Sequence, residues 1–592
     1  MELEGRYFLQ NGKRFWPIGF NYWPSATGVH CWKRFDLDEW KEDFRAIAAR
    51  GYNTVRLFLL WEDFQHAEDT VDETQLGNLA AVCAAAAECD LWVVPTMFQG
   101  WMSGTNFDPP WRKGRNHVRD PEMRKAMLLL ARAVAKTLRE AGNFLAMDYA
   151  NEIDCICPDV NDASVRGWTE DLADAIRAER PGTIVTNGTA VNPFRSASKW
   201  SFGAQEIDFM CVHGYPVFWN PLPAGSLGSC RASLKSGHIS AFAGAYGPHM
   251  REEFGTAMGG DGALIGDFVR ASVMSSYLAG SNGFLYWCWR DFSTEEFPYQ
   301  DCPFEASLGY ADVSLEPKEW SAGLDQARDW ILAHAGFAPV PSDAAIYVPS
   351  LFKRMGPEVD RAIASAYENL AANGINPSVT VEMGQDLALV VVPFAHLTVD
   401  EIAALDRYVS AGGRAIILSL PWRTCGGYWE RLTGTRNTDI LSGREGLDLE
   451  WNGTSVRIGP LDRYRMIPVL EAAGGSARAV LEHDGVPFVF SSDRGEGRVV
   501  QFVPPLHEIA SDDVDAGQVS FWGELIGLSG YESPVTVSDR RCQAGVIENA
   551  EGDRRVLVIN HGAEETRVRI EGLGTSWDLE IEGKGFACCG EP

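Results

Sequence analysis

The stretch DLDEWKEDFRAIAARGYNTVRLFL, residues 36–59, holds one helix followed by one strand, and this order decides the fold. Asp36 and Glu39 have the spacing of a helix N-terminus, and apolar residues recur on one helix face until Gly51 ends the helix. Residues 54–59 then form an apolar run of strand length. Helices alternating with buried strands are typical of α/β proteins with a parallel sheet.

The same alternation extends on both sides of this stretch, from about residue 6 to residue 331. Eight repeats over this length predict a (β/α)8 TIM barrel, which we assign to residues 1–335. The eight strand candidates are residues 16–20, 54–59, 91–97, 144–149, 183–187, 209–212, 250–252 and 284–287.

Two further domains are predicted after the barrel. Residues 336–532 resume the alternation of short strands and helices, which is typical of a flavodoxin-like α/β domain. Residues 533–592 contain only strand-like runs separated by glycine and acidic turns, which predicts a small antiparallel β domain of the sandwich type.

Charge and composition exclude several classes of partner. The chain has 52 Lys and Arg against 81 Asp and Glu, a net charge of -29 that would repel DNA, RNA and anionic membranes. The longest apolar runs, such as residues 387–395, are about half the length that a bilayer crossing needs. The first residues carry acidic groups and no apolar signal core, and the 13 cysteines suit a reducing compartment. We therefore expect a cytoplasmic protein with no nucleic-acid or membrane partner.

Carboxylates stand at the ends of two predicted barrel strands. Strand four ends in Asn151-Glu152, and strand seven ends in Glu252-Glu253-Phe-Gly. In a TIM barrel these ends form the active-site face, and a facing pair of carboxylates is the equipment of glycoside hydrolysis. Because neighbours along a strand alternate in direction, we expect only one of Glu252 and Glu253 to face the lumen.

On these residues the chain resembles glycoside hydrolase clan A, and within it family 5. The resemblance implies that Glu152 is the acid/base and Glu253 the nucleophile of a retaining enzyme. Asn151 would bind the sugar 2-hydroxyl, and Arg56 with Tyr215 would favour the ionised form of Glu253. The remaining substrate-binding residues implied are His213, Trp287 and, on the loop after strand three, Trp101.

The loop of residues 99–117 is long, aromatic and rich in glycine. Loops of this length are usually functional, so this one either closes one end of the cleft or covers the barrel rim. Cys155 and Cys157 follow the predicted acid/base, but two thiols alone do not make a four-ligand zinc site. We predict no metal and no cofactor.

The flavodoxin-like domain resembles the trimerisation domain of family 42 β-galactosidases, which itself is similar to class I glutamine amidotransferases. Amidotransferase chemistry needs a cysteine nucleophile on a sharp turn, and Cys425 lies outside such a context. A structural role is therefore favoured, and the resemblance implies a homo-oligomer, most simply a trimer.

Taken together, the sequence predicts a retaining, exo-acting β-glycosidase that hydrolyses short β-linked oligosaccharides. β-Mannose is the leading sugar on the family 5 resemblance, because that family is rich in enzymes that act on β-mannosidic and β-glucosidic bonds and poor in β-galactosidases. The domain order points the other way, towards the family 42 β-galactosidases. The alternatives are a β-galactosidase or β-glucosidase of the same clan, then an endo-β-mannanase or cellulase, and then a sugar-binding protein without catalysis.

Overall fold

Eight parallel strands close into a barrel in the first half of the chain. The computed structural model describes residues 1–590 except 191–193, 197, 216–225, 257–260, 385, 422–425, 443–444, 460, 462–464 and 509–510. Cys425 lies outside the described residues. The barrel strands, in order around the closed sheet, are β4 (Ile18–Tyr22), β5 (Thr54–Phe58), β6 (Trp92–Gln99), β9 (Met147–Asn151), β10 (Val185–Thr189), β11 (Met210–His213), β12 (His249–Phe254) and β13 (Phe284–Tyr286).

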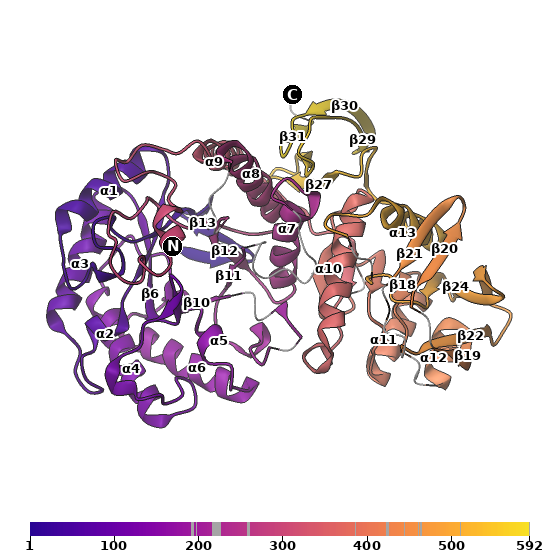
Figure 1. Ribbon diagram of the computed structural model, residues 1–592, viewed down its shortest axis with the longest axis horizontal. Helices are drawn as coiled ribbons and strands as arrows, with labels where there is room; N and C mark the ends of the chain where they lie inside the picture. The colour runs from indigo at the N-terminus through magenta and orange to yellow at the C-terminus, as the bar shows by residue number, and fades with distance from the viewer. Residues whose placement is uncertain are drawn as a thin grey trace.

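Every predicted barrel strand overlaps one of these eight, so the predicted fold class is confirmed. The strands are almost wholly buried because helices cover the outside of the barrel (Figure 1). At the start of the first helix, the Asp36 side chain accepts the Asp38 backbone N–H, so the N-cap read from the sequence is present. The surrounding helices are α1 (Leu37–Ala49), α3 (Glu73–Ala87), α4 (Pro121–Thr137), α6 (Asp162–Glu179), α7 (Cys230–Gly244), α8 (Gly262–Leu278) and α9 (Ser321–Ala333).

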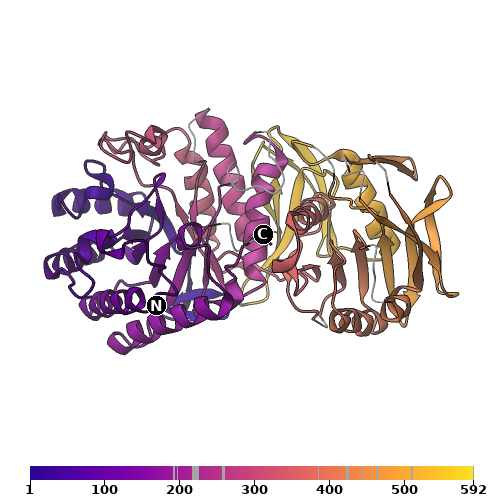
Figure 2. The same ribbon diagram turned by 60° about the horizontal axis from the view of Figure 1, so that its bottom comes forward.

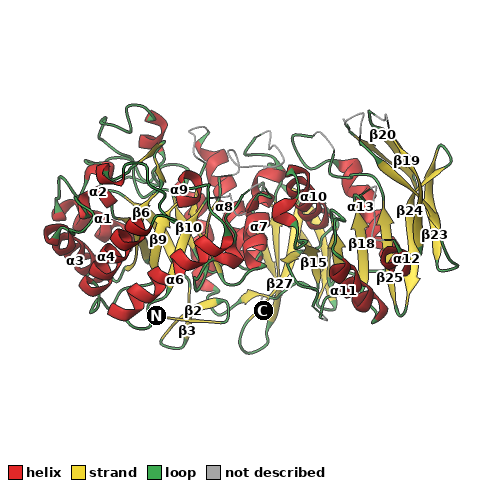
Figure 3. Cartoon of the chain, turned by 90° about the horizontal axis from the view of Figure 1, so that it is seen from below, coloured by secondary structure: helices red, strands yellow, loops and turns green. Residues whose placement is uncertain are grey.

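The amino-terminal end of the barrel is closed by three short antiparallel strands that the sequence patterns did not predict. They are β1 (Glu2–Glu4), β2 (Tyr7–Gln10) and β3 (Lys13–Phe15), and Figure 3 shows β2 and β3 beneath the barrel. Phe8 of this sheet is fully buried and packs edge-on against Phe209, with the ring centroids 5.2 Å apart. The open end, where ligands bind, is therefore the opposite one.

The second part of the chain forms a seven-stranded sheet. Its parallel part follows the order second, first, third, fourth, fifth strand, which is the flavodoxin-like order. Two antiparallel strands extend one edge. The strands in spatial order are β16 (Ser378–Thr380), β15 (Ala344–Tyr347), β17 (Leu389–Val392), β18 (Arg414–Leu418), β25 (Gly497–Phe502), β24 (Val486–Arg494) and β23 (Ala477–His483).

Four helices accompany this sheet: α10 (Pro357–Ala372), α11 (Val399–Ser410), α12 (Gly427–Thr433) and α13 (Ala516–Ser529). Two hairpin-like pairs lie outside it, β19 (Thr435–Leu441) with β22 (Ile467–Ala472) and β20 (Leu447–Trp451) with β21 (Thr454–Ile458).

The last residues form two small antiparallel sheets around a common apolar core. One sheet also includes β14 (Ala338–Pro339), from the segment that follows the barrel. The strands are β26 (Val535–Val537), β27 (Cys542–Glu548), β28 (Arg554–Asn560), β29 (Thr566–Gly572), β30 (Thr575–Ile581) and β31 (Phe586–Cys589). In Figure 2 these strands, drawn in yellow, lie beside the barrel helices α7 and α8. The domain borders at residues 335 and 532 stay predictions.

Helix α7 joins the barrel to both later parts of the chain. It packs against α8 of the barrel on one side and α10 of the flavodoxin-like domain on the other (Figure 1). Arg231 of α7 and Glu368 of α10 are both buried and form an ion pair at 3.0 Å. Lys584, near the C-terminus, donates to the Ser233 hydroxyl at 3.1 Å. The three parts of the chain therefore share one buried contact region.

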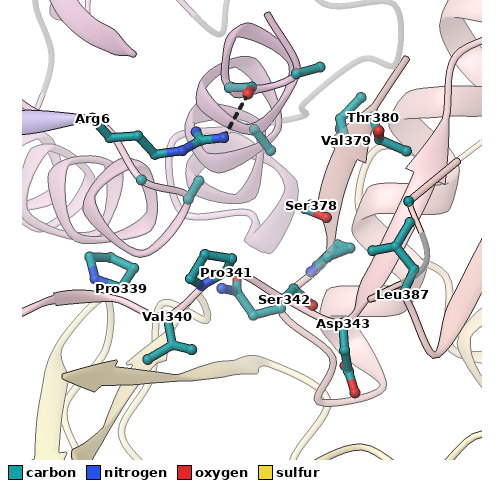
Figure 4. Close-up of a pocket in the computed structure, with 18 of the residues that line it drawn as sticks. Arg6, Pro339, Val340, Pro341, Ser342, Asp343, Ser378, Val379, Thr380 and Leu387 are labelled. Carbon is teal, nitrogen blue, oxygen red and sulfur yellow. Dashed lines mark hydrogen bonds between the residues drawn. The ribbon is translucent and has the colours of Figure 1, made fainter. Parts of the chain in front are cut away.

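A cavity of about 470 Å³ lies where the segment after the barrel meets the flavodoxin-like domain. Figure 4 shows residues 339–343 along one side and residues 378–380 across from them. Arg6 reaches this cavity, and its guanidinium donates to the Gly244 carbonyl at 3.3 Å.

Of the helices that the structure describes, none combines the length and the apolar character needed to span a membrane.

Candidate active site

Arg56 lies at the centre of the open barrel end and holds several carboxylates together. It projects from β5, is fully buried, and pairs with Asp148 at 2.7 Å and with Glu252 and Glu253 at 3.3 Å each. A buried guanidinium without a partner would be costly, so these contacts account for its place in an apolar strand. Burial lowers the pKa of Arg56, but the surrounding carboxylates outweigh it, so this side chain is a permanent cation.

Glu152 follows directly after β9 and has an unusual backbone conformation. Its φ of 49° lies in the left-handed region, which costs a residue other than glycine of order 1–3 kcal/mol. Its N–H donates to the Gly188 carbonyl at 2.9 Å, which holds the turn. The side chain is only 12% exposed, and its carboxylate lies 3.0 Å from Nδ1 of His213. The strained turn therefore directs the carboxylate into the site.

Glu253 faces Glu152 from strand β12. The Tyr215 hydroxyl donates to its Oε1 at 2.7 Å, and Arg56 donates to its Oε2 at 3.3 Å. Both contacts favour the ionised form of Glu253. Burial is the larger effect, however, and with the nearby charge of Glu152 it leaves the pKa of Glu253 raised. Two donors thus hold Glu253, and burial makes its carboxylate more basic than that of an exposed glutamate.

The expectation that only one of the two adjacent glutamates faces the lumen is wrong. Glu252 is fully buried inside the barrel, 3.3 Å from Arg56 and 3.3 Å from Nε2 of His213. Strand β12 changes register against both of its neighbours, between Val212 and His213 on one side and between residues 251 and 254 on the other. Such irregularities break the alternation of side chains, so both glutamates point inward.

His213 at the end of β11 bridges the carboxylates. Its Nδ1 lies 3.0 Å from Glu152 and 3.4 Å from Glu253, and its Nε2 faces Glu252. Burial lowers the pKa of His213, but the Glu253 charge and the contacts with the other two glutamates outweigh it and raise the pKa to about 10. The ring is therefore an imidazolium at neutral pH, and it donates from both nitrogens.

The other predicted binding residues also reach this end of the barrel. Asn151 is buried, accepts from Arg56 at 3.0 Å and donates to the Trp101 carbonyl at 2.6 Å. Trp287 follows β13 and is 4% exposed, whereas Trp101 on β7 (Trp101–Met102) is 44% exposed. With Glu152, Glu253 and Tyr215 they line one pocket of about 540 Å³.

Several residues of the site are not predicted by the sequence patterns. Asp148, three residues before Asn151, is the main partner of Arg56, and Thr96 and Asn21 also bond to that guanidinium. Asp148 and Asn21 are polar residues within barrel strands, a signal that could have found them. Glu305 lines the pocket from a short 3-10 helix, Pro303–Ser307, and had no comparable signal in the sequence.

Two groups of three residues in the described part of the chain have the spacing to hold a metal ion. One is Glu152, His213 and Glu253, where the protonated imidazole opposes a cation. The other is Glu358, His507 and Glu508, where Arg361 and Arg465 already neutralise the carboxylates. Cys155 and Cys157 belong to neither group.

The arrangement is suited to acid/base and nucleophilic chemistry at a sugar carbon. One oxygen each of Glu152 and Glu253 and one nitrogen of His213 all lie within 4.8 Å of one another. The two carboxylates face a pocket lined by Trp101, Trp287 and other apolar groups. Flat indole rings above such a pair are the usual surface for a sugar ring. The fold and the site together define a glycoside hydrolase.

Comparison with known proteins agrees with this class. Residues 10–220 match the family model of cellulases of glycosyl hydrolase family 5. Among solved structures, the exo-beta-1,4-mannosidase Op5Man5 from Opitutaceae bacterium strain TAV5 is 25% identical, covers 90% of this chain and 98% of its own, and has a TM-score of 0.79. No curated protein sequence matches the chain.

Two more solved structures are similar in fold. GH5_18 from Streptomyces cattleya is 24% identical and covers 64% of this chain and 99% of its own, with a TM-score of 0.59. Gan42B, a GH42 beta-galactosidase from G. stearothermophilus, is 12% identical and covers 99% of both chains, with a TM-score of 0.73. The chain is thus a glycoside hydrolase with a family 5-like barrel and a family 42-like overall architecture, as the sequence predicted.

Proposed function

We propose that this protein is a retaining, exo-acting β-mannosidase that works by double displacement. The observation that carries the proposal is the closeness of the two carboxylates, whose nearest oxygens lie within 4.8 Å. Retaining glycosidases hold their carboxyl groups about 5–5.5 Å apart, whereas inverting enzymes need about 6.5–9.5 Å to admit a water.

In the first step the Glu253 carboxylate attacks the anomeric carbon and the bond to the leaving oxygen breaks. Glu152 gives its proton to that oxygen, and a glycosyl ester on Glu253 results. In the second step Glu152 takes a proton from water, the water oxygen attacks the anomeric carbon, and Glu253 leaves as a carboxylate. The His213 cation, 3.0 and 3.4 Å from the two carboxylates, stabilises each of them when it is negative.

Exo action is supported by the loops at one end of the pocket. The turn between β7 and β8 (Thr105–Asn106) lies against the loop that follows β13, since a Cβ on Gly104 would meet the Cys302 sulfur. Phe107 and Phe297 also pack together, with centroids 6.2 Å apart. Such a closed end favours a pocket for a terminal sugar over an open cleft.

The choice of mannose rests on the similarity to the exo-beta-1,4-mannosidase, which is 25% identical and covers 90% of this chain. The GH42 beta-galactosidase is similar over the full length but only 12% identical, so it supports the architecture rather than the sugar. β-Galactosidase and β-glucosidase are the alternatives within the class, followed by an endo-β-mannanase or cellulase.

Proton NMR of the hydrolysis of 4-nitrophenyl β-mannoside tests the stereochemistry. We expect β-mannose to appear first and the α-anomer to follow by mutarotation, and the reverse order would refute double displacement. Chromatography of a mannotetraose digest should reveal mannose and mannotriose first. Mannobiose as the earliest product, or faster cleavage of the aryl β-galactoside, would refute the exo or the mannose assignment. If no aryl β-glycoside is hydrolysed, the enzyme proposal is refuted and the alternative of a sugar-binding protein without catalysis is favoured.

We also propose a closed homo-oligomer, most simply a trimer, with the region of residues 340–530 in the interface. The exposed apolar side chains Val399, Tyr428 and Met466 lie in this region and supply surface for such a contact. Light scattering that gives the mass of a monomer at micromolar concentration would refute this proposal.

A further inference from the structure

Glu305 is a third carboxylate in the catalytic pocket, and the two-step mechanism does not use it. It lies on the 3-10 helix Pro303–Ser307, in the loop after β13, and lines the same pocket as Glu152 and Glu253. Its Oε2 accepts from the indole N–H of Trp287 at 3.3 Å. Because Trp287 is a predicted substrate-binding residue and lines this pocket, Glu305 lies directly beside an aromatic surface for the sugar ring.

Glu305 belongs to the wall that closes the pocket. Its neighbour Phe304 also lines the pocket, and Cys302, three residues before Glu305, touches the turn at Gly104. Ser103, on that same turn, lines the pocket together with Glu305. The loops that follow β6 and β13 thus meet beside this carboxylate.

The charge of Glu305 is not balanced within the described residues, where no lysine, arginine or histidine forms an ion pair with it. Burial and the negative charges of Glu253 and Glu152 raise the pKa of Glu305 to about 7. A carboxylate in this position costs folding free energy and gives no structural ion pair in return. What the pocket gains is an acceptor with two oxygens, of which Oε2 also accepts from the Trp287 indole.

We propose that Glu305 is a specificity residue that recognises the non-reducing end of the substrate. Its carboxylate accepts hydrogen bonds from the 3- and 4-hydroxyls of the terminal sugar, the ring edge opposite the anomeric carbon. A neighbouring pair of hydroxyls matches the two oxygens of one carboxylate. A sugar whose 4-hydroxyl is already glycosylated lacks one of these donors, and the next sugar unit would clash with the loops that close the pocket. This inference rests on the proposed exo-glycosidase function, and it names the residue that would recognise the terminal sugar.

The test compares wild type, Glu305→Ala and Glu305→Gln on the aryl β-glycoside that the wild type cleaves best and on its 4-deoxy analogue. Glu305→Ala should lower kcat/KM on the parent glycoside by about 10²-fold, because a hydrogen bond to a charged group is lost. On the 4-deoxy analogue, which lacks the donor, the same change should cost less than about 5-fold. Glu305→Gln keeps one acceptor oxygen and should lie between.

Asp301→Asn is the matched control, because it neutralises an exposed carboxylate in the same loop and should leave kcat/KM unchanged. Equal losses on both substrates in Glu305→Ala would overturn the inference and assign Glu305 to the charge balance of the site. Because the parent glycoside is chosen by the wild type, a preference for galactose or glucose leaves this test intact. A wild type without any glycosidase activity would refute the proposed function and this inference together.

Discussion

The barrel and the flavodoxin-like sheet both collect charged side chains towards the carboxyl ends of parallel strands, but they balance those charges differently. In the barrel, Arg56 and His213 are surrounded by Glu152, Glu252, Glu253 and Asp148. In the second sheet, Arg361 pairs with Glu508 at 3.0 Å and Arg465 pairs with Glu358 at 2.8 Å. The barrel site has more carboxylates than cations, whereas the site in the second sheet has one arginine for each carboxylate.

The consequences for proton affinity are opposite. Burial and the charge of Glu252 raise the pKa of Asp148 to about 6, and burial with the charge of Glu152 raises that of Asp154 to about 7. Burial also acts on Glu508, but His507 and Arg361 outweigh it and lower its pKa to about 2. Asp148 and Asp154 therefore keep their protons to a higher pH than Glu508, and perturbed pKa values of this kind cluster at functional sites.

The first way to break this comparison is to remove the nucleophile. Glu253→Ala should lower kcat by about 10⁴-fold or more, because no glycosyl ester can form. Added azide should restore turnover and yield an α-glycosyl azide, since it attacks from the side that the carboxylate occupied. Glu508→Ala, in the balanced site, is the matched control and should keep wild-type kcat. A β-azide from Glu253→Ala would contradict the assignment.

Removal of the acid/base should give the next largest effect. Glu152→Ala should lower kcat/KM by about 10²–10⁴-fold on a disaccharide, whose leaving group needs the proton. On 2,4-dinitrophenyl glycosides the loss in kcat/KM should be far smaller, because this leaving group departs unprotonated. The ratio of the two losses is the measurement. Equal losses would assign Glu152 a role other than proton transfer.

Removal of a cation from each site compares their contributions to stability. Arg56→Met should lower the free energy of unfolding by about 3–5 kcal/mol, because buried carboxylates lose their shared partner. Arg361→Met should cost less than about 1 kcal/mol, because that side chain is 32% exposed. Differential scanning calorimetry at pH 7 measures both changes. Similar shifts of Tm in the two variants would show that the two arginines contribute equally to stability, which would contradict the comparison of the two sites.

The pH dependence of stability gives the smallest effect, with opposite signs in the two sites. The folded pKa of Asp154, about 7, lies above its ordinary 3.8, so the folded state holds a proton that the unfolded state has lost. Its contribution therefore declines as pH rises from about 4 to 7. Asn mimics the protonated acid, so Asp154→Asn should gain roughly 1–3 kcal/mol over wild type at pH 8 and nothing at pH 4.

Glu508 is the counterpart, with a folded pKa of about 2 against an ordinary 4.5. Its stabilisation is fully present above about pH 4.5 and is lost as pH falls through 2. Glu508→Gln should therefore lower Tm at pH 8, and this difference should shrink as the pH falls from 4.5. Thermal unfolding of both variants and wild type between pH 3 and 8 decides the matter. Changes of the same sign at pH 8 would contradict the comparison.

The parts of the structure that the sequence predicted depend on local patterns. The eight strands follow from apolar runs of strand length, and Glu152 was located because polar residues that end barrel strands face the open side. Glu252 was misplaced because the register shifts of β12 arise from its neighbours and leave no mark in its own residues. Glu305 was missed because it reaches the site from a loop, whose path the chain does not specify locally.

Helix α7 has a consequence for how this architecture can be inherited. It connects β11, which carries His213, to β12, which carries Glu253, and its outer side is buried against α10. A barrel transplanted without the second domain would expose this helix and leave Arg231 without Glu368. The two domains are therefore not interchangeable modules. A substitution in α10 changes the packing of α7, which lies between the two strands that carry His213 and Glu253. Substitutions in α10 and α7 are therefore expected to be coupled in evolution.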